Sequence, residues 1–124
     1  MNFIRHDTFL EIDRSELAYL FANGDFSEKV RNHSDRVVVL MSQDWCPQWT
    51  AMKAFLGDFT GSTSIFVLLY NRHPQFGQIL DFKENRFHND EIPYLRYYSK
   101  GCLVAESAYL RRDAFAAMLG REKK

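Results

Sequence analysis

Two runs of apolar and β-branched residues constrain the fold more than any other feature of this sequence. They are RVVVLMS at Arg36–Ser42 and SIFVLLY at Ser64–Tyr70. Continuous apolar runs of this kind are typical of strands in a sheet that is covered on both faces. A helical pattern, CPQWTAMKAFLG, lies between them, with Pro47 at its first position and Gly57 near its end. This order predicts two parallel strands joined by a crossover helix.

The flanking segments continue the alternation of strands and helices. Thr8–Ile12 predicts a first strand, and the helix after it has Ser15 as N-cap and is bent or broken at Gly24. HPQFGQILDFKEN and LRRDAFAAML predict two further helices, and YLRYYSKGCLVAES predicts a hairpin that turns at Gly101. The order β-α-β-α-β-α-β-β-α predicts one domain over residues 1–124. Its fold class is α/β, a three-layer sandwich with a central mixed β-sheet flanked by helices.

The charge balance limits the classes of partner. Sixteen basic and sixteen acidic residues give a formal net charge of zero, which removes the electrostatic support for binding nucleic acid or an anionic membrane. No segment has the run of about 18 apolar residues that crosses a bilayer, and the first residues lack the pattern of a signal peptide. Two distant cysteines imply no disulfide framework. We therefore expect a cytoplasmic protein that binds neither nucleic acid nor membrane.

Three motifs, in this order, resemble those of the thioredoxin family. The first is a buried strand that runs into Trp-Cys, in VVVLMSQDWC. The second is Ile92-Pro93 in EIPYLRYYSKG, and the third is the hairpin with Gly101 in its turn, followed by the closing helix. The resemblance covers about residues 8–120 and implies the thioredoxin fold. It also implies that the peptide bond before Pro93 is cis and that this proline lies against Cys46.

Cys46 is the predicted reactive residue. A cysteine directly before a helix can point its sulfur at the free backbone amides of the first turn, here those of Gln48 and Trp49. Such hydrogen bonds and the helix dipole favour the thiolate, which is the nucleophilic form. The order Cys-Pro is closer to the Cys-Pro-Tyr-Cys motif of glutaredoxins than to the Cys-Gly-Pro-Cys motif of thioredoxins. The alternative is a small buried cysteine without chemistry.

The motif Trp-Cys-Pro-Gln-Trp departs from the family at its last position. Trp49 stands where the family has a resolving cysteine, so internal attack cannot release a mixed disulfide on Cys46. Leu40 stands where thioredoxins carry a buried acid that serves proton transfer at the resolving thiol. Together the two changes indicate that the dithiol mechanism has been lost. Cys102 is not expected to bond to Cys46, because in the resembled fold its hairpin turn points away from the site.

Two functions of different classes fit these residues, and a redox-inert protein is a third interpretation. One is a monothiol thiol–disulfide oxidoreductase that acts on protein or peptide thiols and disulfides, with Cys46 as the catalytic residue and glutathione as a candidate external co-substrate. The other is a non-catalytic module that binds a peptide or protein partner. The predicted substrate-binding residues are Trp45, Pro47, Trp49, Ile92 and Pro93. The histidines show no metal-ligand spacing with Cys46, so we predict no metal site and no bound cofactor. The oligomeric state stays open.

Two further segments carry weaker expectations. Tyr94, Tyr97 and Tyr98 alternate along a predicted strand, so part of them should face the core and the rest should form an exposed aromatic edge. The charged segment FKENRFHNDE, ahead of Pro93, reads as a solvated loop near Cys46 that could influence the choice of partner.

Overall fold

A computed structural model describes residues 5–6 and 9–120. Thr8 of the predicted first strand lies outside these residues. The elements are β1 (Arg5–His6), β2 (Phe9–Glu11), α1 (Arg14–Asn23), α2 (Glu28–Arg31), β3 (Arg36–Ser42), α3 (Pro47–Leu56), β4 (Ser64–Leu69), α4 (Phe76–Asn85), β5 (Tyr94–Ser99), β6 (Cys102–Ser107) and α5 (Arg112–Leu119). Two short 3₁₀ helices, η1 (Gly57–Phe59) and η2 (Tyr70–Arg72), follow α3 and β4.

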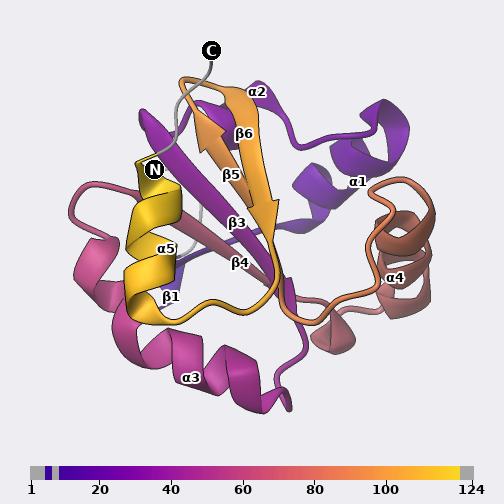
Figure 1. Ribbon diagram of the computed structural model, residues 1–124. Helices are drawn as coiled ribbons and strands as arrows, with labels where there is room; N and C mark the ends of the chain where they lie inside the picture. The colour runs from indigo at the N-terminus through magenta and orange to yellow at the C-terminus, as the bar shows by residue number, and fades with distance from the viewer. Residues whose placement is uncertain (1–4, 7–8, 121–124) are drawn as a thin grey trace.

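The strands form one mixed sheet in the order β1-β2-β4-β3-β5-β6. Both β2 and β3 run parallel to β4, whereas β5 is antiparallel to β3 and to β6. Helices α1, α2 and α4 lie on one face of the sheet, and α3 and α5 lie on the other (Figure 1). This arrangement confirms the predicted α/β sandwich with a central mixed sheet.

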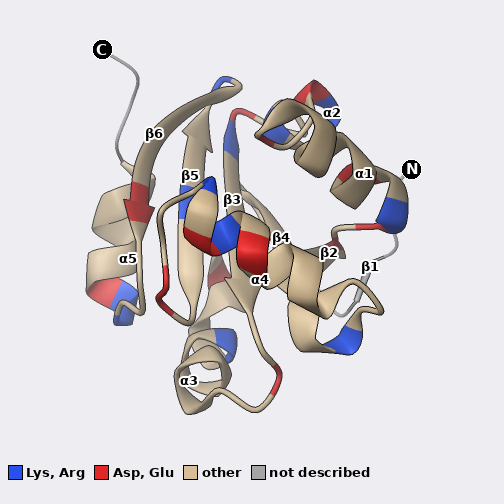
Figure 2. Cartoon of the chain, turned by 90° about the vertical axis from the view of Figure 1, so that its right-hand side faces the viewer, with Lys and Arg blue, Asp and Glu red and all other residues tan. Residues whose placement is uncertain are grey.

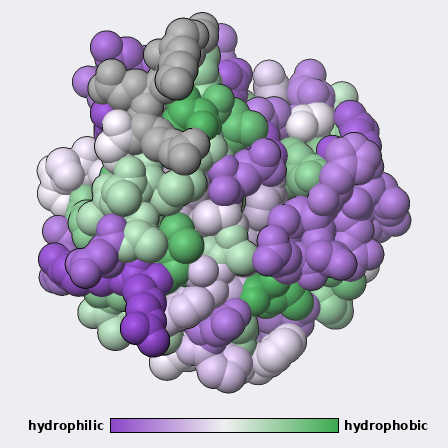
Figure 3. All heavy atoms as spheres, in the orientation of Figure 1, coloured by the Kyte–Doolittle hydropathy of each residue, from purple (hydrophilic) through white to green (hydrophobic). Residues whose placement is uncertain are grey.

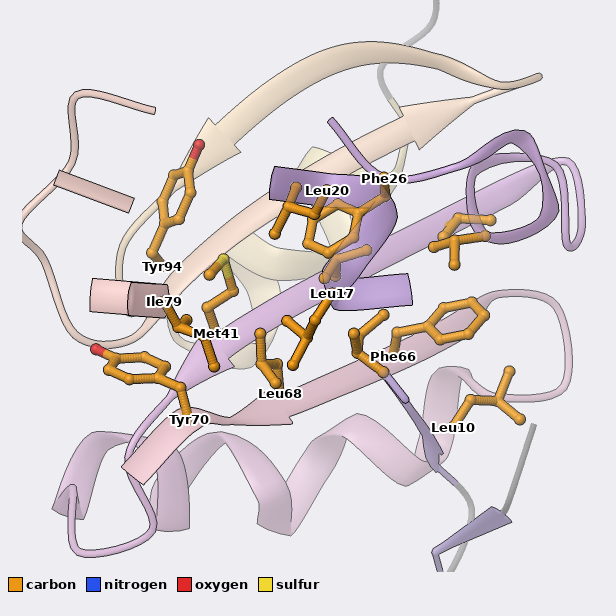
Figure 4. Packing of buried hydrophobic residues seen from close by; sticks show 14 of the residues in the cluster. Leu10, Leu17, Leu20, Phe26, Met41, Phe66, Leu68, Tyr70, Ile79 and Tyr94 are labelled. Carbon is orange, nitrogen blue, oxygen red and sulfur yellow. The ribbon is translucent and has the colours of Figure 1, made fainter. Parts of the chain in front are cut away.

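Strand β3 supplies residues to both faces of the sheet, which explains its unbroken apolar sequence. Val37, Val39 and Met41 belong to the core beneath α1 and α4, and Figure 4 shows Met41 among the side chains of this core. Val38 and Leu40 point into the core beneath α3 and α5. All five side chains are at most 1% exposed, because successive residues of a strand face opposite sides and both sides are covered.

The ends of α1 correct one expectation and confirm another. Asp13, not Ser15, is the N-cap, because its carboxylate accepts a hydrogen bond from the backbone N–H of Glu16 at 2.9 Å. Ser15 lies inside the first turn and donates its hydroxyl to the same carboxylate. Gly24 ends the helix at φ 86°, and its N–H donates to the carbonyl oxygen of Leu20 at 2.8 Å. This left-handed conformation favours glycine.

The expectation of an exposed aromatic edge on β5 is wrong. Tyr94, Tyr97 and Tyr98 are all at most 2% exposed. The reason is that β5 lies between β3 and β6, while Tyr94 and Tyr98 face one core and Tyr97 faces the other. Every residue of this strand is therefore covered, which its mixed sequence does not indicate.

The segment expected to be a solvated loop is partly helical. Helix α4 extends to Asn85, and both Phe82 and Lys83 within it are buried. The chain after α4 is mostly exposed, and hydrophilic side chains gather over α4 and its C-terminal loop at the right of Figure 3. Basic and acidic residues lie close together on α2, α4 and α5 (Figure 2). No helix in the described ranges is long and apolar enough to cross a bilayer.

Candidate functional site

Cys46 lies at the junction between β3 and α3. The strand ends at Ser42, and the helix begins at Pro47 with Cys46 as its N-cap in an extended conformation. The backbone N–H of Cys46 donates to the carbonyl oxygen of Gln43 at 3.1 Å, and the carbonyl oxygen of Cys46 accepts from the N–H of Thr50 at 3.2 Å. Backbone hydrogen bonds on both sides of the cysteine therefore hold it at the start of the helix.

The thiol of Cys46 does not cap α3, contrary to the expectation. Its side chain makes no capping hydrogen bond, so the amides of Gln48 and Trp49 do not bind the sulfur. Instead the sulfur packs in the core beneath α3, only 4% of the residue is exposed, and the thiol donates to the carbonyl oxygen of Ile92 at 3.9 Å. The sulfur is therefore held against the backbone of the loop before β5.

The loop before β5 reaches the cysteine from a distant part of the chain. The Ile92–Pro93 peptide bond is cis, which is the isomer that the family resemblance implies. Pro93 is buried, and Ile92 is half-buried against the same core that holds Cys46. The fold thus brings together two of the three motifs on which the sequence resemblance rests.

The two tryptophans of the motif lie in different environments. Trp45 is 61% exposed, and its indole N–H donates to the side-chain oxygen of Gln43 at 2.6 Å. Trp49 is 5% exposed and packs against Phe9, with 6.1 Å between the ring centroids. Trp45 therefore contributes to the surface beside Cys46, whereas Trp49 belongs to the core and adds almost no area to that surface.

The region inside α3 is apolar where a dithiol site would need polar groups. Leu40 is fully buried, and it belongs to the same core cluster as Trp49 and Cys46. Cys102, the second cysteine of the sequence, is not part of this cluster. A disulfide between Cys46 and a residue of this core therefore cannot form.

Tyr70 is a site residue that the sequence reasoning missed. It is fully buried, and its hydroxyl has no hydrogen-bond partner among the described residues. Burial raises the pKa of this phenol above 10.0, and the neighbouring side chain of Gln43 partly opposes the shift. The signal was available in the sequence: β3 and β4 are parallel, with Ser42 opposite Leu69, so the residues that follow both strands meet at one edge. Figure 4 shows the Tyr70 hydroxyl turned away from the aliphatic side chains of its core.

A polar cluster holds the loop before Cys46 against η2. The carboxylate of Asp44 accepts from the side chain of Arg72 at 2.7 Å and from the amide of Asn71 at 2.7 Å. The Asn71 side-chain oxygen accepts in turn from the backbone N–H of Asp44 at 2.9 Å. Hydrogen bonds from Arg72 and Asn71 lower the pKa of Asp44 below 3.8. The loop conformation is thus coupled to the end of β4.

Cys102 lies at the other end of the sheet. It pairs with Ser99, which pairs with Arg36 at the start of β3, whereas Cys46 follows the end of this strand at Ser42. Six steps of a strand span about 20 Å, far more than a disulfide allows. Both cysteines are free.

Comparisons with known proteins complete the description of the fold. No family model matches the sequence, and no curated protein matches it significantly. Among solved structures, thioredoxin O2 from Arabidopsis thaliana superposes with a TM-score of 0.61 at 11% identity, over 87% of this chain and 90% of that protein. A thioredoxin point mutant from Halobacterium salinarum gives 0.59 at 16% identity, over 74% and 78% of the two chains. The chain has the thioredoxin fold.

A third neighbour supports the same assignment. Mitochondrial thioredoxin 3 from Saccharomyces cerevisiae superposes with a TM-score of 0.57 at 12% identity, over 74% of this chain and 83% of that protein. These identities establish the thioredoxin fold alone. Within residues 5–6 and 9–120, no group of three His, Cys, Asp or Glu residues could hold a metal ion.

Proposed function

We propose that this thioredoxin-fold chain carries out thiol–disulfide exchange through the single thiol of Cys46, with an external thiol such as glutathione completing the cycle. The observation that supports it is the place of Cys46, at the N-terminus of α3, next to the exposed Trp45 and against the loop that contains Ile92 and Pro93. Trp45, Pro47, Ile92 and Pro93 are the proposed contacts for a peptide or protein substrate. Trp49 supports them from the core.

The proposed reaction has two exchange steps. The Cys46 thiol loses its proton to solvent and attacks the glutathione sulfur of a protein–glutathione mixed disulfide. A Cys46–glutathione disulfide forms, and the protein leaves as a thiolate that takes up a proton. The thiolate of a second glutathione then attacks the glutathione sulfur of that disulfide. Oxidised glutathione forms, and Cys46 is released as a thiolate.

One observation favours a second candidate function, a binding module without redox chemistry. Cys46 is only 4% exposed and its thiol hydrogen is donated to Ile92, whereas the neighbouring Trp45 is 61% exposed. Aromatic residues with large exposed area are frequent anchors of protein interfaces. In this case Trp45 and the loop at Pro93 hold an extended peptide, and Cys46 contributes only packing.

A single set of variants separates the two candidates. Wild type, Cys46→Ser and Cys102→Ser are incubated with a glutathionylated peptide and glutathione, and both released peptide and protein-bound glutathione are measured by mass spectrometry. Thiol exchange predicts that wild type and Cys102→Ser release peptide and that Cys46→Ser does not. A wild type that releases no peptide above the glutathione background contradicts the exchange mechanism. Retained peptide binding by Cys46→Ser, with loss in Trp45→Ala, then supports the binding module.

A further inference from the structure

A cavity of about 330 Å³ lies between α3, the end of β4 and the segment that contains β2. Residues from all three segments line it, and Cys46 is not among them. Its size is at the lower end of the range of small-molecule sites in proteins. The cavity is therefore separate from the thiol and has room for a compact ligand.

The deep wall of the cavity is apolar and contains two aromatic rings. Phe9 and Trp49 approach each other with centroids 6.1 Å apart and planes tilted by 59°. Val67 and Leu69 of β4 extend the same wall. An aromatic wall of this kind favours a flat, apolar ring, because aromatic pairs gain from stacked or edge-to-face contact.

Two cationic side chains on the rim of the cavity, those of Lys53 and Arg72, have N–H groups that are free to donate hydrogen bonds to a ligand. Lys53 is exposed and forms no ion pair or hydrogen bond with any other residue that the structure describes. Arg72 is also exposed and uses its Nε on the carboxylate of Asp44, which leaves its terminal nitrogens for a ligand. Both cations therefore have donors to offer.

The acceptors on the rim are already engaged. Both carboxylate oxygens of Asp44 accept hydrogen bonds, one from Asn71 and one from Arg72. Glu11, the other acid on the rim, takes part in another interaction. Burial lowers the pKa of His73 below 6.5, so its imidazole is neutral at pH 7 and adds no charge. The charge of Asp44 is thus paired with that of Arg72, and Lys53 remains as a rim cation without a partner among the described residues, so a ligand with a negative charge finds a counter-ion there.

We propose that this cavity binds a small aromatic anion, a planar ring system with one carboxylate or sulfonate group. The ring lies against Trp49 and Phe9, and the acid group binds Lys53 and Arg72. This site is independent of the thiol function proposed above, because no step at Cys46 is needed for binding.

The test uses the full chain and 2-naphthoate as the probe. The chain has two tryptophans, so two indole N–H signals appear in a ¹⁵N-correlated NMR spectrum, and Trp45→Phe assigns them. We expect 2-naphthoate to shift the Trp49 signal in a saturable way and to leave the Trp45 signal in place. The neutral analogue 2-naphthamide should bind at least about tenfold more weakly, because it lacks the charge that Lys53 and Arg72 recognise.

Lys53→Met tests the position of the acid group at a side chain that is exposed. We expect the variant to bind 2-naphthoate about tenfold more weakly and to bind 2-naphthamide as wild type does. Arg111→Met removes an exposed cation outside the cavity and should leave both affinities unchanged. Three results overturn the proposal: no saturable shift of Trp49, equal affinity of wild type for acid and amide, or an unchanged affinity for 2-naphthoate in Lys53→Met.

Discussion

The sulfur of Cys46 lies 3.9 Å from the carbonyl oxygen of Ile92, the residue before the cis peptide bond. In this position the thiol acts as a hydrogen-bond donor, and its hydrogen is directed at the backbone of the neighbouring loop. Only 4% of Cys46 is exposed, whereas the neighbouring Trp45 is 61% exposed. The same contact therefore orients the thiol and shields it.

Removal of the Tyr70 hydroxyl is expected to stabilise the protein. No group in the described part of the chain has hydrogen-bond geometry with this buried hydroxyl, although the side chain of Gln43 lies close enough to lower its pKa, so Tyr70→Phe should raise the free energy of unfolding by up to about 1 kcal/mol. Tyr98→Phe is the matched control, because the Tyr98 hydroxyl donates to Asp25 and accepts from Arg96, and its loss should destabilise by about 1–2 kcal/mol. Urea denaturation measures both. A destabilised Tyr70→Phe would mean that the hydroxyl has a partner in solution.

Arg96 is expected to be essential to the stability of the sheet. It is 6% exposed, donates to the hydroxyls of Tyr94 and Tyr98 at 2.9 and 2.8 Å, and pairs with Asp25 at 3.3 Å. Arg96→Met removes two hydrogen bonds to buried phenol oxygens and the ion pair with Asp25, so it should lower the free energy of unfolding by about 2 kcal/mol. Arg111→Met removes an exposed arginine and should change it by less than about 0.5 kcal/mol in the same chemical denaturation experiment.

The hairpin turn at Gly101 should tolerate no side chain. This glycine has φ 83°, and a Cβ atom there would lie 2.5 Å from the side-chain oxygen of Asn32. Gly101→Ala should therefore cost about 2 kcal/mol, from the left-handed conformation and from the close contact. Gly61→Ala meets no atom within 4 Å and serves as the control. Equal melting temperatures of the two variants in a thermal scan would contradict the turn geometry.

The stability of the protein should fall in mild acid because of His73. Burial lowers the pKa of its imidazole below 6.5, and the negative charge of Glu11 only partly opposes this. As the pH falls below about 6.5, His73 takes up a proton in the unfolded chain but not yet in the folded chain. The free energy of unfolding therefore decreases, and it stops decreasing once the pH is below the folded-state pKa of His73. His73→Asn should flatten this part of the plot of unfolding free energy against pH. The exposed His88→Asn is the control, and an equal slope in both variants would rule out His73 as the cause.

A second thiol at position 49 should restore only part of a dithiol activity. Trp49 is one helical turn from Cys46, so the thiol introduced by Trp49→Cys is close enough to bond with it. The substitution Trp49→Cys also removes a buried indole ring and should lower the free energy of unfolding by about 3 kcal/mol. In an insulin-reduction assay with dithiothreitol, Trp49→Cys should be faster than wild type. The double variant Trp49→Cys/Leu40→Asp should be faster than Trp49→Cys, because the aspartate supplies a proton acceptor.

Trp49→Ser is the control for this experiment, because it creates a similar space without a thiol. Its rate should equal that of wild type. If wild-type protein already reduces insulin at the rate of a dithiol thioredoxin, the argument from the missing cysteine is wrong. If a folded double variant is no faster than Trp49→Cys, the side chain of Leu40 does not face the position of the new thiol.

The sequence alone determined the fold class and which residues make up the candidate site. The runs that became β3 and β4 are apolar at nearly every position, a pattern that only a sheet with both faces covered explains. Pro47 marked the start of α3 at the correct residue, and the motif around Ile92 and Pro93 placed a second loop next to Cys46. These features depend on local patterns and on the order of motifs, which a sequence displays directly.

Only the tertiary structure decided how each side chain of the site is oriented and how far it is exposed. The sequence has two tryptophans near Cys46, but Trp49 packs against Phe9 in the core while Trp45 remains outside. It predicted that the thiol would bind the helix amides, yet the sulfur turns to a carbonyl oxygen 46 residues away in the chain. Such choices depend on which distant residues fill the space beside a side chain. That competition between long-range contacts leaves no local pattern in the sequence.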